Sequence, residues 1–251
     1  MDDQRAGFAA ALSVLALLFL FLTSGANAST VLVVSAPKGP TYFGADSQIS
    51  QVNGSDARFG CKIHVANNFV WASAGLLAET RGPFNLERIV THVLTSGLPL
   101  SRAVDELQAQ MENEYPDFRS RALQSGIDVL NARIQIVVAD VREPGHVTWL
   151  RFGDEFPQRT DCPGAIECAA SLGVLFPLGR VEEINRILDS RPAIWTEMGR
   201  SEAIRYLIAA QEKVTPQFVS GPISILEIKQ DGPHWLSHGS CGVKPANLRR
   251  K

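Results

Sequence analysis

From Val31 on, the pattern of hydrophobic and polar positions changes between strand-like and helical segments, beginning and ending with strands. The first part predicts four strands in two hairpins: Val31–Ser35, Thr41–Ala45, Lys62–Ala66 and Phe69–Ala74. Pro37–Pro40 is a turn by composition, and Asn67-Asn68 tolerates the positive φ of a tight hairpin turn. Asp46–Gly60, which joins the two hairpins, is polar and contains the turn signal Asn53-Gly54.

The pattern then becomes helical, returns to strands, and repeats this change once. Apolar residues at helical spacing predict helices over Phe84–Leu94, Ser101–Met111, Val181–Leu188 and Ser201–Val214, and Pro116–Gln124 either extends or follows the second of them. Alternating or continuous apolar runs predict strands over Leu130–Val141, His146–Phe152, Ile223–Lys229 and His234–Trp235. Asn85 is placed to cap the first helix, and Arg159–Gly179 has no clear period. Paired strands alternating with paired helices favour an α+β fold, a four-layer αββα sandwich of two antiparallel sheets with helices outside.

The first 28 residues have the composition of a targeting segment. Ala6–Leu22 is almost wholly apolar, and Ala26-Asn27-Ala28 matches the small-residue pattern of signal cleavage. We therefore predict a signal peptide over 1–28, a domain over 29–236 and an unstructured tail over 237–251, in a protein exported to the periplasm or outside the cell. The apolar run is at the short limit for a membrane span, so a retained membrane anchor is the alternative.

Charge and cysteine content exclude several classes of function. The formal net charge is −2 and the isoelectric point is about 6.2, which gives no electrostatic case for binding nucleic acid. Cys162 and Cys168 are a natural local pair, whereas Cys61 and Cys241 could pair or stay free. His234, His238 and Cys241 have only a loosely zinc-like spacing, so we predict no metal and no cofactor.

Three residues near the predicted cleavage point could combine into a nucleophilic site. Cleavage would expose Ser29 or Thr30, whose α-amine, with a pKa of about 7.7–8, could accept the proton of its own hydroxyl. Asp46 follows the second strand and Lys62 begins the third. A lysine beside the nucleophile would stabilise developing negative charge, and a carboxylate would orient that lysine. Each residue alone has an ordinary explanation, as a turn aspartate or a solvated lysine, so the joint spacing carries the hypothesis.

The runs TVLVVSAPKGPTYFGADSQ and CKIHVANNFVWASAGLLAET resemble proteasome β-subunits and HslV-type N-terminal nucleophile (Ntn) hydrolases. Asp46 and Lys62 follow Thr30 at the offsets that the acid and the lysine have from the nucleophile in that family. The resemblance implies catalytic roles for Thr30 (or Ser29), Asp46 and Lys62, and an oxyanion-binding backbone N–H at Gly75. It also implies that Ser220, in Ser220-Gly221, is the family's downstream serine. By the same resemblance, the substrate is a peptide or amide and the protein could form a homo-oligomer.

Two features leave alternatives open. The ungapped spacing selects Thr30 as the nucleophile, whereas the cleavage pattern selects Ser29. Ala169–Gly173 matches the family's Gly-Ser-Gly segment poorly, and Val214–Val219 lacks the expected aspartate. The sequence therefore predicts either an exported Ntn hydrolase with an N-terminal nucleophile or a catalytically silent, proteasome-like structural or binding subunit.

Overall fold

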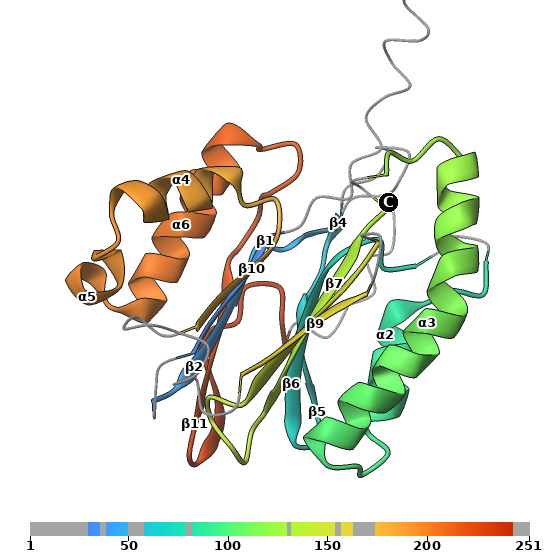
Figure 1. Cartoon of the computed structure of the whole chain (residues 1–251). Coiled ribbons are helices and arrows are strands. Elements are labelled where there is room, and N and C mark those ends of the chain that lie inside the picture. The colour runs from blue at the N-terminus through green and yellow to red at the C-terminus, as the bar shows by residue number, and fades with distance from the viewer. Residues whose placement is uncertain are drawn as a thin grey trace, which may run out of the picture.

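The chain forms two five-stranded antiparallel sheets that pack face to face between two layers of helices (Figure 1). This computed structural model describes residues 30–35, 39–49, 58–78, 82–129, 132–153, 157–162 and 174–242. The predicted signal segment, its alternative role as an anchor, and Ser29 lie outside these ranges. Within them, no helix is long and apolar enough to cross a bilayer.

The first sheet contains the N-terminal hairpin in its middle. Its strand order is β10 (Val174–Gly179), β1 (Thr30–Ser35), β2 (Thr41–Ala45), β11 (Ser224–Lys229) and β12 (Gly232–Ser237). The second sheet has the order β5 (Ile63–Ala66), β6 (Phe69–Gly75), β7 (Ile134–Asp140), β8 (Val147–Phe152) and β9 (Gln158–Cys162). A short pair, β3 (Gln48–Ile49) and β4 (Arg58–Phe59), lies between β2 and β5 in the chain.

Each sheet is covered on its outer face by its own group of helices. Helices α2 (Leu86–Leu94) and α3 (Leu100–Gln124) pack on the second sheet. Helices α4 (Glu182–Ser190), α5 (Ile194–Met198) and α6 (Arg200–Val214) pack on the first (Figure 1). The predicted αββα sandwich is therefore confirmed.

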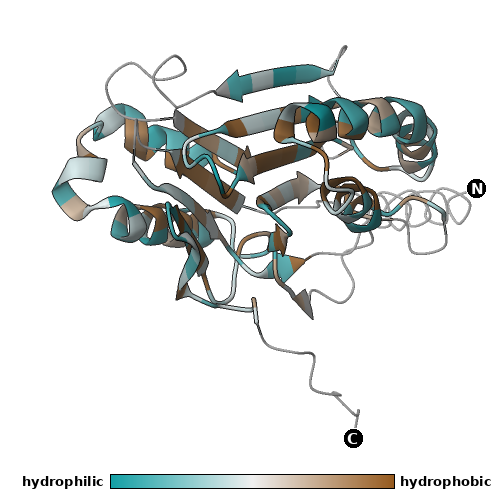
Figure 2. Cartoon of the chain, turned by 90° about the horizontal axis from the view of Figure 1, so that it is seen from below, coloured by the Kyte–Doolittle hydropathy of each residue, from teal (hydrophilic) through white to brown (hydrophobic). Residues whose placement is uncertain are grey.

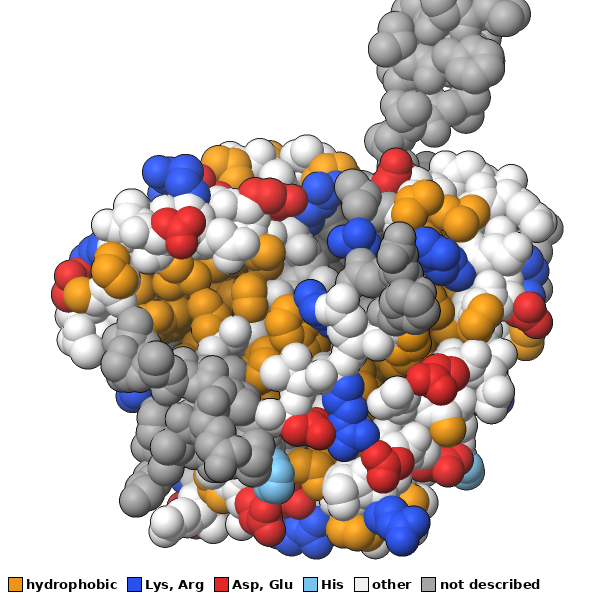
Figure 3. Space-filling model, viewed as in Figure 1, with side chains coloured by type: hydrophobic (Ala, Val, Ile, Leu, Met, Phe, Trp, Pro, Cys, Tyr) orange, Lys and Arg blue, Asp and Glu red, His pale blue; other side chains and the backbone are white. Residues whose placement is uncertain are grey.

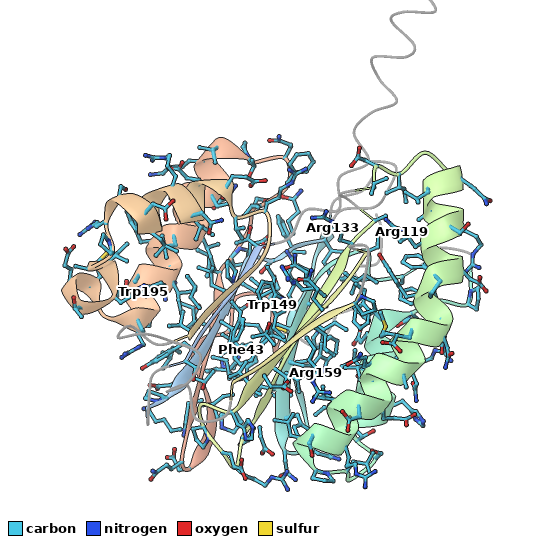
Figure 4. All side chains as sticks on the ribbon, viewed as in Figure 1. Phe43, Arg119, Arg133, Trp149, Arg159 and Trp195 are labelled. Atoms are coloured by element: carbon cyan, nitrogen blue, oxygen red, sulfur yellow. A yellow bond between two sulfur atoms is a disulfide. The ribbon has the colours of Figure 1, made fainter. Side chains whose placement is uncertain are left out.

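Alternation along β1 shows how the sequence builds this layering. Val31 and Val33 belong to the core between the sheets, whereas Leu32 and Val34 belong to the core under α4, α5 and α6. A strand buried on both faces needs a continuous apolar run, which β1 has. Phe43 and Trp149 fill the space between the sheets (Figure 4). Hydrophobic strands accordingly form the middle of the molecule, and the outer sides of the helices are hydrophilic (Figure 2).

The structure settles one open alternative and differs from the prediction in two places. Pro116–Gln124 extends the preceding helix, so that α3 runs unbroken through Pro116, because Met111, Tyr115 and Phe118 bury one continuous face against the second sheet. Strands β9 and β10 come from the segment without a clear period, where edge position relaxes the pattern. The predicted tail from residue 237 needs correction over 237–242: Ser237 ends β12, and Cys241 is 1% exposed and disulfide-bonded.

Candidate functional site

Pairing within the first hairpin brings Thr30 and Asp46 together. Val31 lies opposite Ala45 in the β1–β2 pair, so the first residue of β1 reaches the residue that follows β2. The Asp46 N–H donates to the Thr30 carbonyl oxygen at 3.2 Å. Thr30 and Asp46 are 16 residues apart in the sequence, and the register of the hairpin brings them together.

The Asp46 carboxylate joins three segments of the chain. Its Oδ1 accepts a hydrogen bond from the Thr30 backbone N–H at 2.7 Å and another from Lys62 Nζ at 2.7 Å. Its Oδ2 accepts from the Gln48 N–H at 3.0 Å. Thr30, Asp46 and Lys62 are 0%, 1% and 3% exposed, so this cluster lies in the interior. The structure thus brings together the three residues on which the hypothesis depends.

Burial changes the acid–base behaviour of Lys62. Loss of water around the ammonium group lowers the pKa of Lys62, and the negative charge of Asp46 opposes this effect without cancelling it. A lysine whose pKa is lowered reaches its neutral, basic form closer to physiological pH. Lys62 therefore gives up its proton more readily than an exposed lysine would.

The Thr30 hydroxyl is bound to the end of the neighbouring edge strand. Thr30 lies opposite Gly179 of β10, and its Oγ1 donates to the Arg180 carbonyl oxygen at 2.6 Å. Nothing in the local sequence marks Arg180 as a partner, because β10 itself lacks a clear pattern. Sequence reasoning could not have found this contact.

Ser220 connects to the site through Gln48. The Ser220 hydroxyl donates to Gln48 Oε1 at 2.6 Å, and the Gln48 Nε2 donates to the Gln217 carbonyl oxygen at 2.7 Å. The Ser47 N–H donates to the Ser220 carbonyl oxygen at 3.2 Å. Ser220 therefore lies against the segment that contains Asp46, and Gln48 is the residue that sequence reasoning missed. Its position two residues after Asp46 was the available signal.

Gly75 ends β6 in a backbone conformation that requires glycine. Its φ is +104°, and a Cβ atom there would lie 1.9 Å from the Arg133 carbonyl oxygen. The contacts in the described ranges include no hydrogen bond between Gly75 and Thr30. Its proposed role as an oxyanion donor stays a prediction.

A disulfide bond lies directly beside the candidate lysine. Cys61, the residue before Lys62, is bonded to Cys241. Of the local pair favoured by the sequence, Cys168 lies outside the described residues. Two of the three residues with zinc-like spacing, His234 and Cys241, have other partners. His234 is hydrogen-bonded to Asp231, and Cys241 is in the disulfide. In the part of the chain that the structure describes, no group of three or more His, Cys, Asp or Glu could hold a metal.

Comparison with known proteins identifies the fold. No family model matches the sequence, and no curated protein matches it. The structure is similar to Anbu (ancestral beta-subunit) from Yersinia bercovieri, with a TM-score of 0.53, 12% sequence identity, and coverage of 83% of this chain and 87% of that chain. Anbu from Hyphomicrobium sp. strain MC1 has the same identity and coverage, with a TM-score of 0.49. At this identity the similarity shows the fold alone, which is the proteasome-like Ntn-hydrolase fold.

Proposed function

We propose that this protein is an Ntn hydrolase that cleaves amide or peptide bonds with Thr30 as its nucleophile, after processing removes the preceding residues. One observation carries the proposal. The backbone nitrogen of Thr30 and the Nζ of Lys62 both donate to the same buried oxygen of Asp46. After cleavage before Thr30, that nitrogen becomes a free α-amine already fixed beside a lysine and a carboxylate.

The chemistry follows from these groups. The α-amine accepts the Thr30 hydroxyl proton as Oγ1 attacks the carbonyl carbon of the substrate, and the nearby Lys62 ammonium favours the negative charge that develops. The tetrahedral intermediate collapses to an ester on Thr30, and the leaving amine takes the proton. A water molecule, deprotonated by the same base, then hydrolyses the ester and releases the acid. Asp46 keeps the base oriented throughout.

Export is part of the proposal. Residues 1–28 have the composition of a signal peptide, and the Cys61–Cys241 bond suits an oxidising compartment. Cleavage of the signal peptide would then either expose Thr30 directly or be followed by removal of Ser29. Assembly into a homo-oligomer is proposed from the family resemblance alone.

A catalytically silent subunit is the second candidate, and one observation favours it. Thr30 is 0% exposed, and its hydroxyl is already bound to the Arg180 carbonyl oxygen. For catalysis, Oγ1 must give up or share that bond, and substrate must gain access to it. A protein that uses this fold only for assembly or binding would have no such requirement.

Substitution of Thr30 in protein beginning at residue 30 decides between the two candidates. The chain would be produced behind a removable N-terminal fusion and tested against a library of fluorogenic peptide amides. We expect turnover by wild type and by Thr30→Ser, no turnover by Thr30→Ala, and an acylated N-terminal peptide by mass spectrometry. Equal turnover by Thr30→Ala would exclude Thr30 as the nucleophile. No turnover by any form would favour the silent subunit.

A further inference from the structure

The Cys61–Cys241 disulfide links the two sheets at the point where the candidate site spans them. Lys62 leads into β5 of the second sheet, whereas Asp46 follows β2 of the first. Cys61 adjoins Lys62 in the sequence. Cys241 comes from the segment after β12, which belongs to the same sheet as Asp46. The covalent bond therefore runs between the same two sheets as the Lys62–Asp46 ion pair.

Local contacts attach both ends of the disulfide firmly. Cys61 Sγ lies 2.8 Å from the Ile63 carbonyl oxygen, and Cys241 Sγ lies 3.8 Å from the same atom. The Cys241 N–H donates to the His238 carbonyl oxygen at 2.6 Å, which also accepts from the Ser224 hydroxyl at 2.9 Å.

Ser224 is the residue of β11 that lies opposite Ala45, directly before Asp46. The disulfide is thus anchored at one end beside Lys62 and at the other beside the Asp46 segment.

Lys62 has little other backbone support on its N-terminal side. The β5–β6 pairing begins only at Ile63, and the neighbouring contact is the Gly60 N–H to the Ser47 carbonyl oxygen at 2.8 Å. Each sheet also has its own core with its own helices, and the core between the sheets, to which Cys241 contributes, is formed mainly by apolar residues of the strands. Loss of the disulfide would therefore loosen the start of β5 more than the rest of the fold.

We propose that the Cys61–Cys241 disulfide is a positioning element for Lys62, so that the site is complete only in the oxidised chain. The inference rests on the proposed function for its catalytic meaning, but it makes a separate claim about the position of Lys62. Because the two cysteines are 180 residues apart, the bond can form only after the chain has been synthesised as far as Cys241.

A dithiol can open this bond by ordinary exchange. One thiolate of dithiothreitol attacks the half-buried Cys61 sulfur, and Cys241 leaves as a thiolate that takes a proton. The second thiol of the reagent then displaces Cys61. The products are two cysteine thiols and the cyclic disulfide of the reagent, so two electrons and two protons reach the protein.

The test compares oxidised and reduced chains that begin at Thr30. Reduced protein would be kept reduced by excess dithiothreitol and assayed for kcat and KM, with circular dichroism as the folding control. In parallel, reductive methylation followed by mass spectrometry would measure the accessibility of Lys62, which does not require turnover. A misplacement of about 1 Å can cost about a hundredfold in rate. We therefore expect kcat to fall by about ten- to a hundredfold with KM nearly unchanged, faster methylation of Lys62, and recovery of both on reoxidation.

Two double variants assign the effect to this bond. Cys61→Ala/Cys241→Ala should show the low kcat without reductant and no response to it. Cys162→Ala/Cys168→Ala should show the same fall in kcat and the same faster methylation of Lys62 on reduction as wild type. If the first variant does not fold, titration of wild type with reductant provides the same comparison.

Two outcomes would overturn the proposal. One is a reduced chain in which kcat is unchanged and Lys62 is still methylated slowly. The other is a loss of activity that occurs only together with loss of the circular dichroism signal. If no form hydrolyses any substrate, the proposed function fails, and the methylation rate alone then decides whether the disulfide positions Lys62.

Discussion

Asp46 holds its neighbours with a negative charge that is almost completely buried. Such a charge is stable only when hydrogen bonds and an opposite charge replace water, and here Lys62 Nζ and two backbone N–H groups do so. The spacing of Thr30, Asp46 and Lys62 in the sequence was enough to predict that they meet. Gln48 was missed although it lies only two residues after Asp46. Arg180 could not be predicted, because its contact with Thr30 joins segments that are 150 residues apart.

Replacing Lys62 by methionine should affect both activity and stability. The substitution keeps the length of the side chain but leaves the Asp46 charge with only backbone donors. We expect the free energy of unfolding to fall by about 3 kcal/mol and activity by at least about a hundredfold. Urea denaturation and steady-state kinetics would measure the two effects.

The matched control is Lys213→Met, on the exposed side of α6, which should change neither quantity measurably. Full activity in Lys62→Met would remove Lys62 from the mechanism. Unchanged stability would mean that the Asp46 charge is satisfied without it.

At the scale of elements, strand register and turn geometry place the site. The β1–β2 register puts Thr30 beside Asp46, and the β2–β11 register puts Ser224 opposite Ala45. The β5–β6 hairpin was predictable, since its turn contains a residue that tolerates the required backbone conformation. Asn67 has a φ of +52° in the β5–β6 turn.

Gly75→Ala should disrupt the end of β6. An added Cβ would meet the Arg133 carbonyl oxygen in a backbone conformation that already disfavours alanine. We expect a loss of at least about 2 kcal/mol in the free energy of unfolding, measured by urea denaturation. Gly97→Ala is the matched control: its φ is +81°, but nothing lies within 4 Å of the added atom, so only the backbone cost of about 1 kcal/mol applies. Equal losses for both variants would show that the close approach to Arg133 does not matter.

Tyr42 links β2 to β11 in a way that depends on pH. Burial, together with its 2.6 Å hydrogen bond to Glu227, raises the pKa of Tyr42 to about 12 from its usual 10.0. Because the folded protein then holds the proton more tightly than the unfolded chain, this stabilisation is complete below pH 10 and is lost as the pH rises toward 12. Between these values, the free energy of unfolding should fall more steeply for wild type than for Tyr42→Phe. Parallel curves for the two proteins would contradict this assignment.

For the whole molecule, the hydrophobic pattern was sufficient to predict the layering but not all of the strands. Runs such as Val31–Ser35 and the amphipathic helices define two sheets with helices outside, because each apolar face has to be covered. The edge strands β9 and β10 were missed, since β9 (QRTDC) is mostly polar and β10 (VLFPLG) contains a proline. The Cys61–Cys241 pair was one of the alternatives that the sequence left open, because the choice depends on a contact across 180 residues.

The surface gives no independent indication of a charged partner. On the face shown in Figure 3, Lys and Arg side chains are interspersed with Asp and Glu. This agrees with a formal net charge of −2 over the whole chain. The functional proposal therefore depends on the interior cluster around Asp46.

The N-terminal sequence of the mature protein, recovered from its native compartment, tests the central claim most directly. Thr30 can act as proposed only if its own nitrogen is a free amine beside Asp46 and Lys62. We predict that the mature chain begins at Thr30. A mature chain that begins at Met1, at Ser29 or at any other residue before Thr30 would leave this nitrogen in a peptide bond, and would contradict the assignment of Thr30 as the nucleophile.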